Sequence, residues 1–229
     1  GRQGALVVID TATGEESRFN PELASKKFAP CSTFKIWNTL IGLETGVLQS
    51  ADQGFYQWDG VKRFVPDWNK DLTLREAFRV SCVPAFQALA RKIGAERMKE
   101  SVDRIEYGDR NVSSGLDVFW LPGQGRTPLL ITAEEQARLM ARLTLKQVPF
   151  SAYAQEALKD IMTVQAMDRG TLYGKTGTDA DDAGNYILGW FVGYVERDGR
   201  TYAFACVLED QSVMGKDARS VVERVLLGA

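Results

Sequence analysis

The sequence predicts a mixed fold of the α/β class, α+β in type: an antiparallel β-sheet flanked by helices, with a helical lobe inserted between its strands. Residues 5–19 have the pattern of a β-hairpin with a turn at Thr13-Gly14. Towards the C-terminus, β-rich runs at 186–196 and 201–209 are joined by an Asp-Gly pair, which is a strong hairpin signal. Helical patterns fill most of the chain between these hairpins, so we expect strands from both ends to share one sheet.

Capping signals and apolar spacing place the helices in chain order. After Ser32, apolar residues recur at helical intervals until Gly46, where the helix is expected to end. Thr-x-x-Glu capping boxes open helices at 73–80 and 132–145, and a helix at 84–93 begins with a proline and is followed by a glycine. A strand is expected at 171–178, and further helices at 95–105, 152–165 and 217–227.

We expect one domain over residues 1–229, divided into two lobes. The sheet lobe takes about 1–30 and 165–229, and the helical lobe takes about 47–164. A cleft between lobes is a common place for a binding or catalytic site. The functional residues are therefore expected where the lobes meet.

The composition excludes several classes of chemistry. The chain has 28 basic and 30 acidic residues, a formal net charge of −2, so neither a nucleic acid nor an anionic membrane surface is an expected partner. There is no apolar run long enough to span a membrane. The sequence contains no histidine, which excludes Ser-His-Asp triads and histidine-ligated metals. Its three cysteines form no CxxC pair, so no metal site is expected.

Ser32 and Lys35 form a candidate nucleophile pair at the start of a helix. Residues three apart share a helix face, so the hydroxyl and the amine can project together. The simpler interpretation is a helix N-cap followed by a solvated lysine. Against it, a cation in the first turn opposes the helix dipole, and Phe34 and Ile36 give Lys35 an apolar setting. A helix N-terminus also offers N–H groups to a developing oxyanion.

A second motif, Lys175-Thr176-Gly177, ends a predicted strand. Gly177 permits a close approach of substrate backbone, while Lys175 and Thr176 supply a cation and a hydroxyl donor. Alone, the tripeptide is equally compatible with an edge strand ending in a turn. An early S-x-x-K and a late K-T-G together form the signature of enzymes that are acylated by penicillin at a serine.

With these motifs in place, the chain resembles the class D serine β-lactamases, the oxacillinase family, over essentially its whole length. The resemblance implies the serine β-lactamase and penicillin-binding-protein type of fold, and hydrolysis of β-lactam antibiotics as a means of resistance. It is carried by segments 30–36, 41–46, 119–121 and 189–193, by Ser81-Cys82-Val83-Pro84, Tyr107-Gly108-Asp109 and Lys175-Thr176-Gly177, and by Arg219.

The resemblance also implies how the reaction proceeds. Ser32 attacks the lactam carbonyl, and Lys35, carrying a carbamate formed from CO₂, is the general base for acylation and deacylation. Ser81 relays the proton to the leaving nitrogen, and no other cofactor is implied. The N–H groups of Ser32 and Thr178 hold the oxyanion. The substrate carboxylate is bound by Lys175, Thr176 and Arg219.

Carbamate formation requires a neutral amine, so the pKa of Lys35 must fall from about 10.4 through desolvation. We expect Phe34, Val83 and Trp120 to form the dry pocket that lowers it. The Trp120 indole N–H is a donor only and would hydrogen-bond the carbamate. The alternative for Trp120 is an ordinary core aromatic.

Two departures from the family pattern bear on these expectations. Asp109 stands where the family has an amide, so we assign it no catalytic role. Cys31 and Cys82 adjoin the two motif serines, whose hydroxyls must approach each other, and this brings the cysteine Cα atoms towards the roughly 4.4–6.8 Å that a disulfide requires. We expect a Cys31–Cys82 disulfide, with two separate buried thiols as the alternative, and Cys206 as a buried strand thiol.

The family resemblance implies a periplasmic or secreted location, with any export signal removed from this chain. Three other functions remain open: an antibiotic sensor that is acylated without turnover, a D,D-peptidase, and a binding domain without catalysis. Val83 argues against the sensor, which tends to carry a polar residue there. The lack of an amide at that position argues against the peptidase. The substrate spectrum and the oligomeric state are not predicted.

Overall fold

A six-stranded antiparallel sheet in the order β2-β1-β8-β7-β6-β5 forms the centre of the computed structural model, which describes residues 3–123 and 125–228. Its strands are β1 (Gln3–Asp10), β2 (Glu16–Phe19), β5 (Thr163–Met167), β6 (Gly170–Ala180), β7 (Tyr186–Arg197) and β8 (Arg200–Glu209). The N-terminal hairpin joins the C-terminal strands because β1 pairs with β8, with Leu6 opposite Cys206. The predicted fold class is confirmed.

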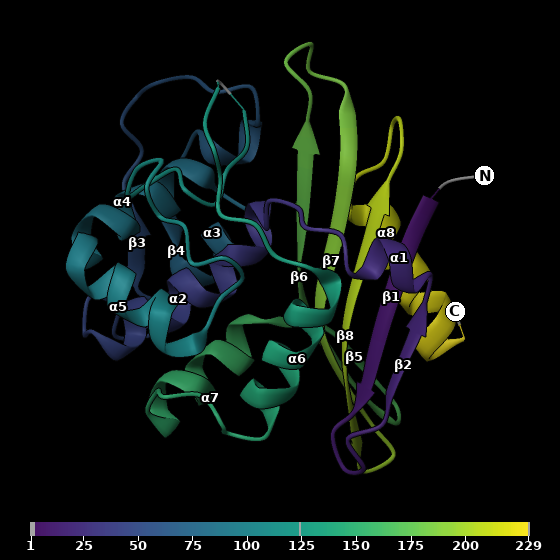
Figure 1. The fold of residues 1–229 in the computed structure, drawn as a ribbon. Coiled ribbons are helices and arrows are strands. Elements are labelled where there is room, and N and C mark those ends of the chain that lie inside the picture. The colour runs from purple at the N-terminus through teal and green to yellow at the C-terminus, as the bar shows by residue number, and fades with distance from the viewer. Residues whose placement is uncertain (1–2, 124, 229) are drawn as a thin grey trace.

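Helices cover both faces of this sheet (Figure 1). The longer ones are α2 (Lys35–Glu44), α4 (Val83–Ile93), α5 (Ala95–Ile105), α6 (Ala133–Thr144), α7 (Ala152–Ile161) and α8 (Gly215–Val222). The shorter elements are α1 (Pro21–Ala24), α3 (Leu74–Arg79), the 3₁₀ turns η1 (Cys31–Phe34) and η2 (Pro66–Trp68), the terminal turn η3 (Glu223–Leu227), and a small sheet of β3 (Gly54–Tyr56) and β4 (Leu72–Thr73). Helix α6 packs against β8 and β1 on one face, and α8 packs on the other.

Both predicted capping boxes are present. Thr73 accepts from the backbone N–H of Glu76, whose carboxylate accepts from the Thr73 backbone N–H at 2.8 Å. The equivalent pair opens α6, where the Thr132 N–H donates to the Glu135 carboxylate at 2.9 Å. Each reciprocal pair satisfies two N–H groups that a helix start leaves without partners.

The predicted helix over 152–165 is wrong at its end, because α7 stops at Ile161 and β5 begins at Thr163. Thr163 and Val164 are β-branched and favour a strand, and β5 pairs along β6 only as far as Thr163 opposite Tyr173. The stretch of β6 beyond Tyr173 therefore has a free edge, and the K-T-G motif lies in it. The predicted lobe boundaries stay a prediction.

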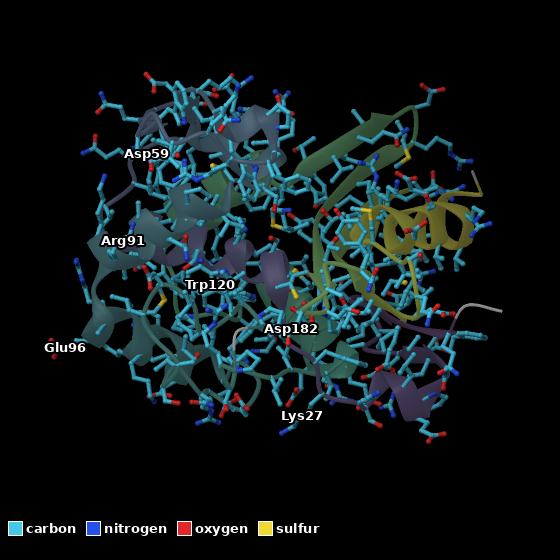
Figure 2. All side chains as sticks on the ribbon, turned by 90° about the horizontal axis from the view of Figure 1, so that it is seen from above. Lys27, Asp59, Arg91, Glu96, Trp120 and Asp182 are labelled. Carbon is cyan, nitrogen blue, oxygen red and sulfur yellow. The ribbon has the colours of Figure 1, made fainter. Side chains whose placement is uncertain are left out.

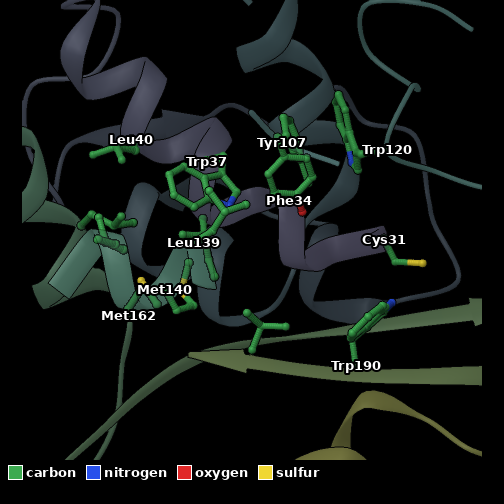
Figure 3. Packing of buried hydrophobic residues seen from close by; sticks show 14 of the residues in the cluster. Cys31, Phe34, Trp37, Leu40, Tyr107, Trp120, Leu139, Met140, Met162 and Trp190 are labelled. Atoms are coloured by element: carbon green, nitrogen blue, oxygen red, sulfur yellow. The ribbon is translucent and has the colours of Figure 1, made fainter. Parts of the chain in front are cut away.

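The main hydrophobic core lies between the sheet and α2, where Phe34, Trp37 and Leu40 have no exposed surface (Figure 3). A second, smaller cluster lies under α8 and includes Phe191 and Phe204. Charged side chains such as those of Arg91 and Glu96 project outward (Figure 2). Within the described residues, no helix has both the length and the apolar character needed to cross a membrane.

Candidate active site

The side chains of Ser32 and Lys35 meet where η1 runs into α2. The Lys35 Nζ donates to the Ser32 Oγ at 2.8 Å. Ser32 is partly exposed, whereas Lys35 has no exposed surface. The spacing of three residues places both groups on one face, as predicted, although the first turn is 3₁₀ rather than α-helical. A nucleophilic hydroxyl at the surface thus touches an amine held in the interior.

Burial lowers the pKa of Lys35 to about 7. Desolvation is the main cause, because burial disfavours the ammonium form, and the thiols of Cys82 and Cys31 oppose the shift. No carboxylate of the described part of the chain forms an ion pair with Lys35. The ring of Phe86, on α4, lies 5.3 Å from Nζ. A substantial fraction of neutral amine at neutral pH follows from this setting.

The backbone is strained beside one motif serine and at the other. Cys31, which precedes the nucleophile, has φ 52°, and Ser81 has φ 57°. Positive φ is disfavoured for residues with a Cβ and concentrates at functional sites. Cys31 is held by a hydrogen bond from its N–H to the Trp120 carbonyl at 3.1 Å. Ser81 lies between α3 and α4, the helix that carries Phe86.

The K-T-G segment of β6 packs directly on the nucleophile turn. A Cβ at Gly177 would lie 3.1 Å from the Pro30 carbonyl oxygen and 3.2 Å from the Thr33 Cγ2, so only glycine fits without displacement. On the opposite face, Gly215 at the start of α8 donates its N–H to the Thr178 Oγ1 at 3.0 Å. The strand is thereby fixed between η1 and α8, and the two distant motifs meet as predicted.

Lys175 is the second buried lysine of the site, with 5% of its surface exposed. Its Nζ donates to the Thr176 carbonyl at 3.0 Å and lies 5.7 Å from the Phe78 ring centroid. Desolvation, followed by the charge of Lys35, lowers its pKa well below the usual value. Lys175 therefore gains its proton most readily when an anion lies nearby.

Arg219 lies one turn after Gly215 on α8, and thus on the face of that helix that meets β6. Its Nε donates to the Glu223 carboxylate at 2.7 Å. Lys175, Thr176 and Arg219 line a single cavity of about 480 Å³. The structure thus brings the three predicted carboxylate-binding residues together.

The three residues predicted to form the dry pocket around Lys35 differ in burial, and the pocket itself stays a prediction. Trp120 stacks on Phe34 with ring centroids 5.6 Å apart, and neither has exposed surface (Figure 3). The buried indole Nε1 of Trp120 has no hydrogen-bond partner among the described residues. Val83 is the partly buried first residue of α4. Phe86, one turn further along α4, is the ring in contact with Lys35, and the sequence interpretation missed it.

A buried hydrogen-bond chain behind the nucleophile was also missed. The Tyr107 hydroxyl donates to the Gln136 Oε1 at 3.2 Å, and the Gln136 Nε2 donates to the Thr33 Oγ1 at 3.0 Å. Thr33 in turn donates to the Pro30 carbonyl at 2.6 Å. The chain ties α6 to the strained turn that carries the nucleophile.

The side chain of Asp109 stabilises the loop in which it lies. Its carboxylate accepts from the backbone N–H groups of Asn111 and Leu130, both at 3.1 Å. Gly108 beside it has φ 53°, and a Cβ there would lie 2.2 Å from the Leu130 carbonyl oxygen. The Tyr-Gly-Asp motif therefore shapes a loop, and the absence of a catalytic role for Asp109 stays a prediction.

We expect Gln136→Leu to lower the free energy of unfolding by about 1–3 kcal/mol, because the buried Tyr107 hydroxyl loses its acceptor. Urea denaturation measures this change. Gln147→Leu is the matched control: Gln147 is exposed, just beyond the end of α6, and its loss is expected to change stability by less than about 0.5 kcal/mol. Equal effects of the two substitutions would contradict the role of the chain.

The predicted Cys31–Cys82 disulfide is wrong, because all three cysteines are free thiols. The Cys31 Sγ points to the Ala29 carbonyl at 3.5 Å, an oxygen that also accepts from the Trp190 Nε1 at 3.0 Å. The thiol of Cys31 therefore lies near Trp190 of β7 (Figure 3), whereas the hydroxyl of its neighbour Ser32 contacts Lys35. Cys206 is a buried thiol on β8, as predicted.

The fold and these motifs define a class of protein that is acylated at a serine. Residues 4–227 match the profile of the penicillin binding protein transpeptidase domain. The chain is 36% identical to the probable β-lactamase YbxI of Bacillus subtilis over 93% of its own length and 77% of that protein. It is 40% identical to the β-lactamase OXA-10 of Pseudomonas aeruginosa over 80% of its own length and 67% of that protein.

Solved structures of other proteins show the same similarity to β-lactamases. The BPu1 β-lactamase superposes with a TM-score of 0.90 at 35% identity, covering 100% of this chain and 92% of the other. FUS-1 (OXA-85), a class D β-lactamase from Fusobacterium nucleatum subsp. polymorphum, superposes with a TM-score of 0.90 at 38% identity, covering 100% and 93%. The protein belongs to the class D β-lactamases, and the resemblance inferred from its sequence is confirmed.

Proposed function

We propose that this protein hydrolyses β-lactams through an acyl-enzyme on Ser32. The observation that carries the proposal is the 2.8 Å contact between the Lys35 Nζ and the Ser32 Oγ, made by a wholly buried lysine whose pKa is lowered to about 7. A hydroxyl is a weak nucleophile unless a neighbouring base takes its proton. Family membership supports the same reaction.

We further propose that Lys35 is carboxylated by CO₂, and that no other cofactor takes part. When carboxylated, the lysine supplies a general base for both Ser32 and the hydrolytic water. Two observations support the fit. Burial favours the neutral amine that reacts with CO₂, and the buried Trp120 Nε1, a donor with no partner among the described residues, is suited to an added carboxylate.

The remaining residues bind and orient the substrate. Lys175, Thr176 and Arg219 hold its carboxylate beside the free edge of β6, and Gly177 lets that strand lie close to the turn that carries Ser32. The Ser32 N–H stands in the first turn of η1, where it has no intrahelical acceptor, and with the Thr178 N–H it stabilises the oxyanion. Ser81 passes a proton to the leaving nitrogen. The protein acts after export, in the periplasm or outside the cell.

We expect Arg219→Ala to raise the KM for penicillins by about 10- to 100-fold, since a hydrogen-bonded charge contact to the substrate carboxylate is lost. Steady-state kinetics measure it. Arg224→Ala is the control, because Arg224 is exposed and its Nε donates to the Ser220 carbonyl rather than towards the site. A KM unchanged by Arg219→Ala would contradict the assignment.

The substrate that is cleaved, and the number of product molecules formed per enzyme molecule, distinguish hydrolysis of β-lactams from two of the three rival functions, the sensor and the D,D-peptidase. The hydrolase is expected to convert many equivalents of a penicillin, as followed by loss of β-lactam absorbance. A sensor would stop after one equivalent. A D,D-peptidase would cleave peptides ending in D-Ala-D-Ala, which Val83, an apolar residue where that class has an amide, disfavours.

A further inference from the structure

One face of α2 runs along α4 and carries Lys35. The Lys35 Nζ lies 5.3 Å from the ring centroid of Phe86 on α4. Seven residues further along α2, a Cβ added at Gly42 would lie 3.1 Å from the Leu89 Cδ1, also on α4. Residues spaced by three, four and seven share a helix face, so Asn38, three residues after Lys35, lies between these two contacts. Asn38 therefore belongs to the face of α2 that is packed on α4.

Asn38 is a wholly buried amide whose polar atoms are both without partners. It has no exposed surface, and neither its Nδ2 nor its Oδ1 has a hydrogen-bond partner among the described residues. The residues that α4 places against this face, Phe86 and Leu89, have no polar side-chain atoms. A buried polar group without a partner is less favourable than an apolar side chain of the same size. The Asn38 amide thus has a donor and an acceptor to offer to a group that is added to the site.

Carboxylation of Lys35 adds such a group. The amine nitrogen forms a bond to the carbon of CO₂ and releases one proton, and the product has two oxygen atoms that accept hydrogen bonds and one N–H that donates. A buried anion is stable only when its oxygens are hydrogen-bonded. Two carboxylate oxygens accept about four hydrogen bonds, of which the Trp120 Nε1 and the Ser32 hydroxyl supply two. Side chains on a helix lean towards its N-terminus, so the Asn38 amide leans over the turn that carries Lys35.

Resting on the proposed carboxylation of Lys35, we infer that Asn38 is a positioning residue for that group: its side-chain amide hydrogen-bonds the carboxylated lysine and retains the CO₂. An amide suits a carbamate because each has a donor and an acceptor side by side. A leucine in place of Asn38 has a similar size but can make neither hydrogen bond. Without the amide, the neutral amine of Lys35 should still react with CO₂, but the carbamate should dissociate more readily.

The test measures carboxylation directly, without a substrate. Protein freed of CO₂ is titrated with bicarbonate labelled with carbon-13 at one fixed, mildly alkaline pH, and the carbamate carbon is followed by NMR. The bicarbonate concentration that gives half of the full signal should rise at least about tenfold in Asn38→Leu, as expected for the loss of one hydrogen bond to a buried charge. Asn38→Ala removes the same amide without adding bulk and should give a rise of the same order.

Stability separates positioning from packing. In the absence of CO₂, the urea midpoint of Asn38→Leu should equal or exceed that of the wild-type protein, because the amide has no partner within the described chain. Gln155→Leu is the matched control, since Gln155 is a buried amide of α7 whose Nε2 donates to the Phe150 carbonyl at 2.8 Å. The start of α7 contacts Glu44, at the opposite end of α2 from Lys35. Gln155→Leu should therefore lower the urea midpoint and keep the wild-type response to bicarbonate.

Three results would overturn the inference. The first is a half-signal concentration in Asn38→Leu equal to that of the wild-type protein, and the second is an equal rise in Gln155→Leu. The third is a marked fall in the urea midpoint of Asn38→Leu without CO₂, which would assign the amide to the fold instead. A wild-type protein that gives no carbamate signal is a different result, because it refutes the carboxylation of Lys35 itself.

Discussion

Ser32→Ala is expected to abolish both the covalent adduct and the hydrolysis of β-lactams. Removing the nucleophile eliminates the bond that the acyl-enzyme requires, so kcat should fall by roughly 10⁴- to 10⁶-fold. The fold should persist, because Ser32 is partly exposed and, among the described residues, its hydroxyl hydrogen-bonds the side chain of Lys35 alone. Intact-mass measurement after incubation with a penicillin detects the adduct directly.

Ser50→Ala is the matched control for this experiment. Ser50 is an exposed serine outside the site, and its loss should leave the adduct and the rate unchanged. A full-mass adduct on Ser32→Ala would show that another residue is acylated, and the nucleophile assignment would then be wrong.

Lys35→Ala is expected to have the second largest effect, and of a different kind. Acylation should become very slow, and any acyl-enzyme that forms should persist, because the same lysine activates the water of deacylation. Adding bicarbonate should restore nothing, since the variant has no amine to carboxylate. The persistence of the adduct, followed by intact mass over hours, is the measurement.

The Lys35 side chain is wholly buried, so its truncation leaves a cavity and destabilises the protein. Lys35→Met keeps most of the volume without the amine, and it is the variant that separates chemistry from stability. If Lys35→Met released its acyl group at the wild-type rate, the lysine would have no part in deacylation.

The sheet was predictable because its signals are local. An Asp-Gly pair sets the β7–β8 hairpin, and two capping boxes set the starts of α3 and α6. The strand β5 was not predictable in this way. It is five residues long, follows a helix with one residue between them, and is mostly exposed, so no alternation of buried and exposed residues marks it.

Only the part of the site that lies in short sequence motifs was predictable. Helical spacing placed Ser32 and Lys35 together, whereas the packing of Gly177 against Pro30 and Thr33 of the same turn joins segments far apart in the chain. Gln136 was missed because a glutamine on an amphipathic helix is usually solvated. Its burial depends on Tyr107 and Thr33 arriving from other elements.

The disulfide prediction failed for a related reason. Proximity of the two motif serines was taken to bring the neighbouring cysteines together. Consecutive residues of a tight turn point in different directions, and the Cys31 thiol faces the Ala29 carbonyl. The positive φ of Cys31 and Ser81, which decides those directions, has no signal in the sequence.

The most direct test of the central claim is the hydrolysis of a chromogenic cephalosporin by the wild-type protein with and without added bicarbonate, after degassing, from neutral to mildly acid pH. With its pKa at about 7, Lys35 is increasingly protonated as the pH falls below that value, and an ammonium cannot carry a carboxylate. We predict that degassing and acidification lower the rate, that bicarbonate restores it, and that turnover continues well beyond one equivalent. Sustained turnover at a rate indifferent to bicarbonate across this range would contradict the carboxylated lysine and leave the base to be sought elsewhere.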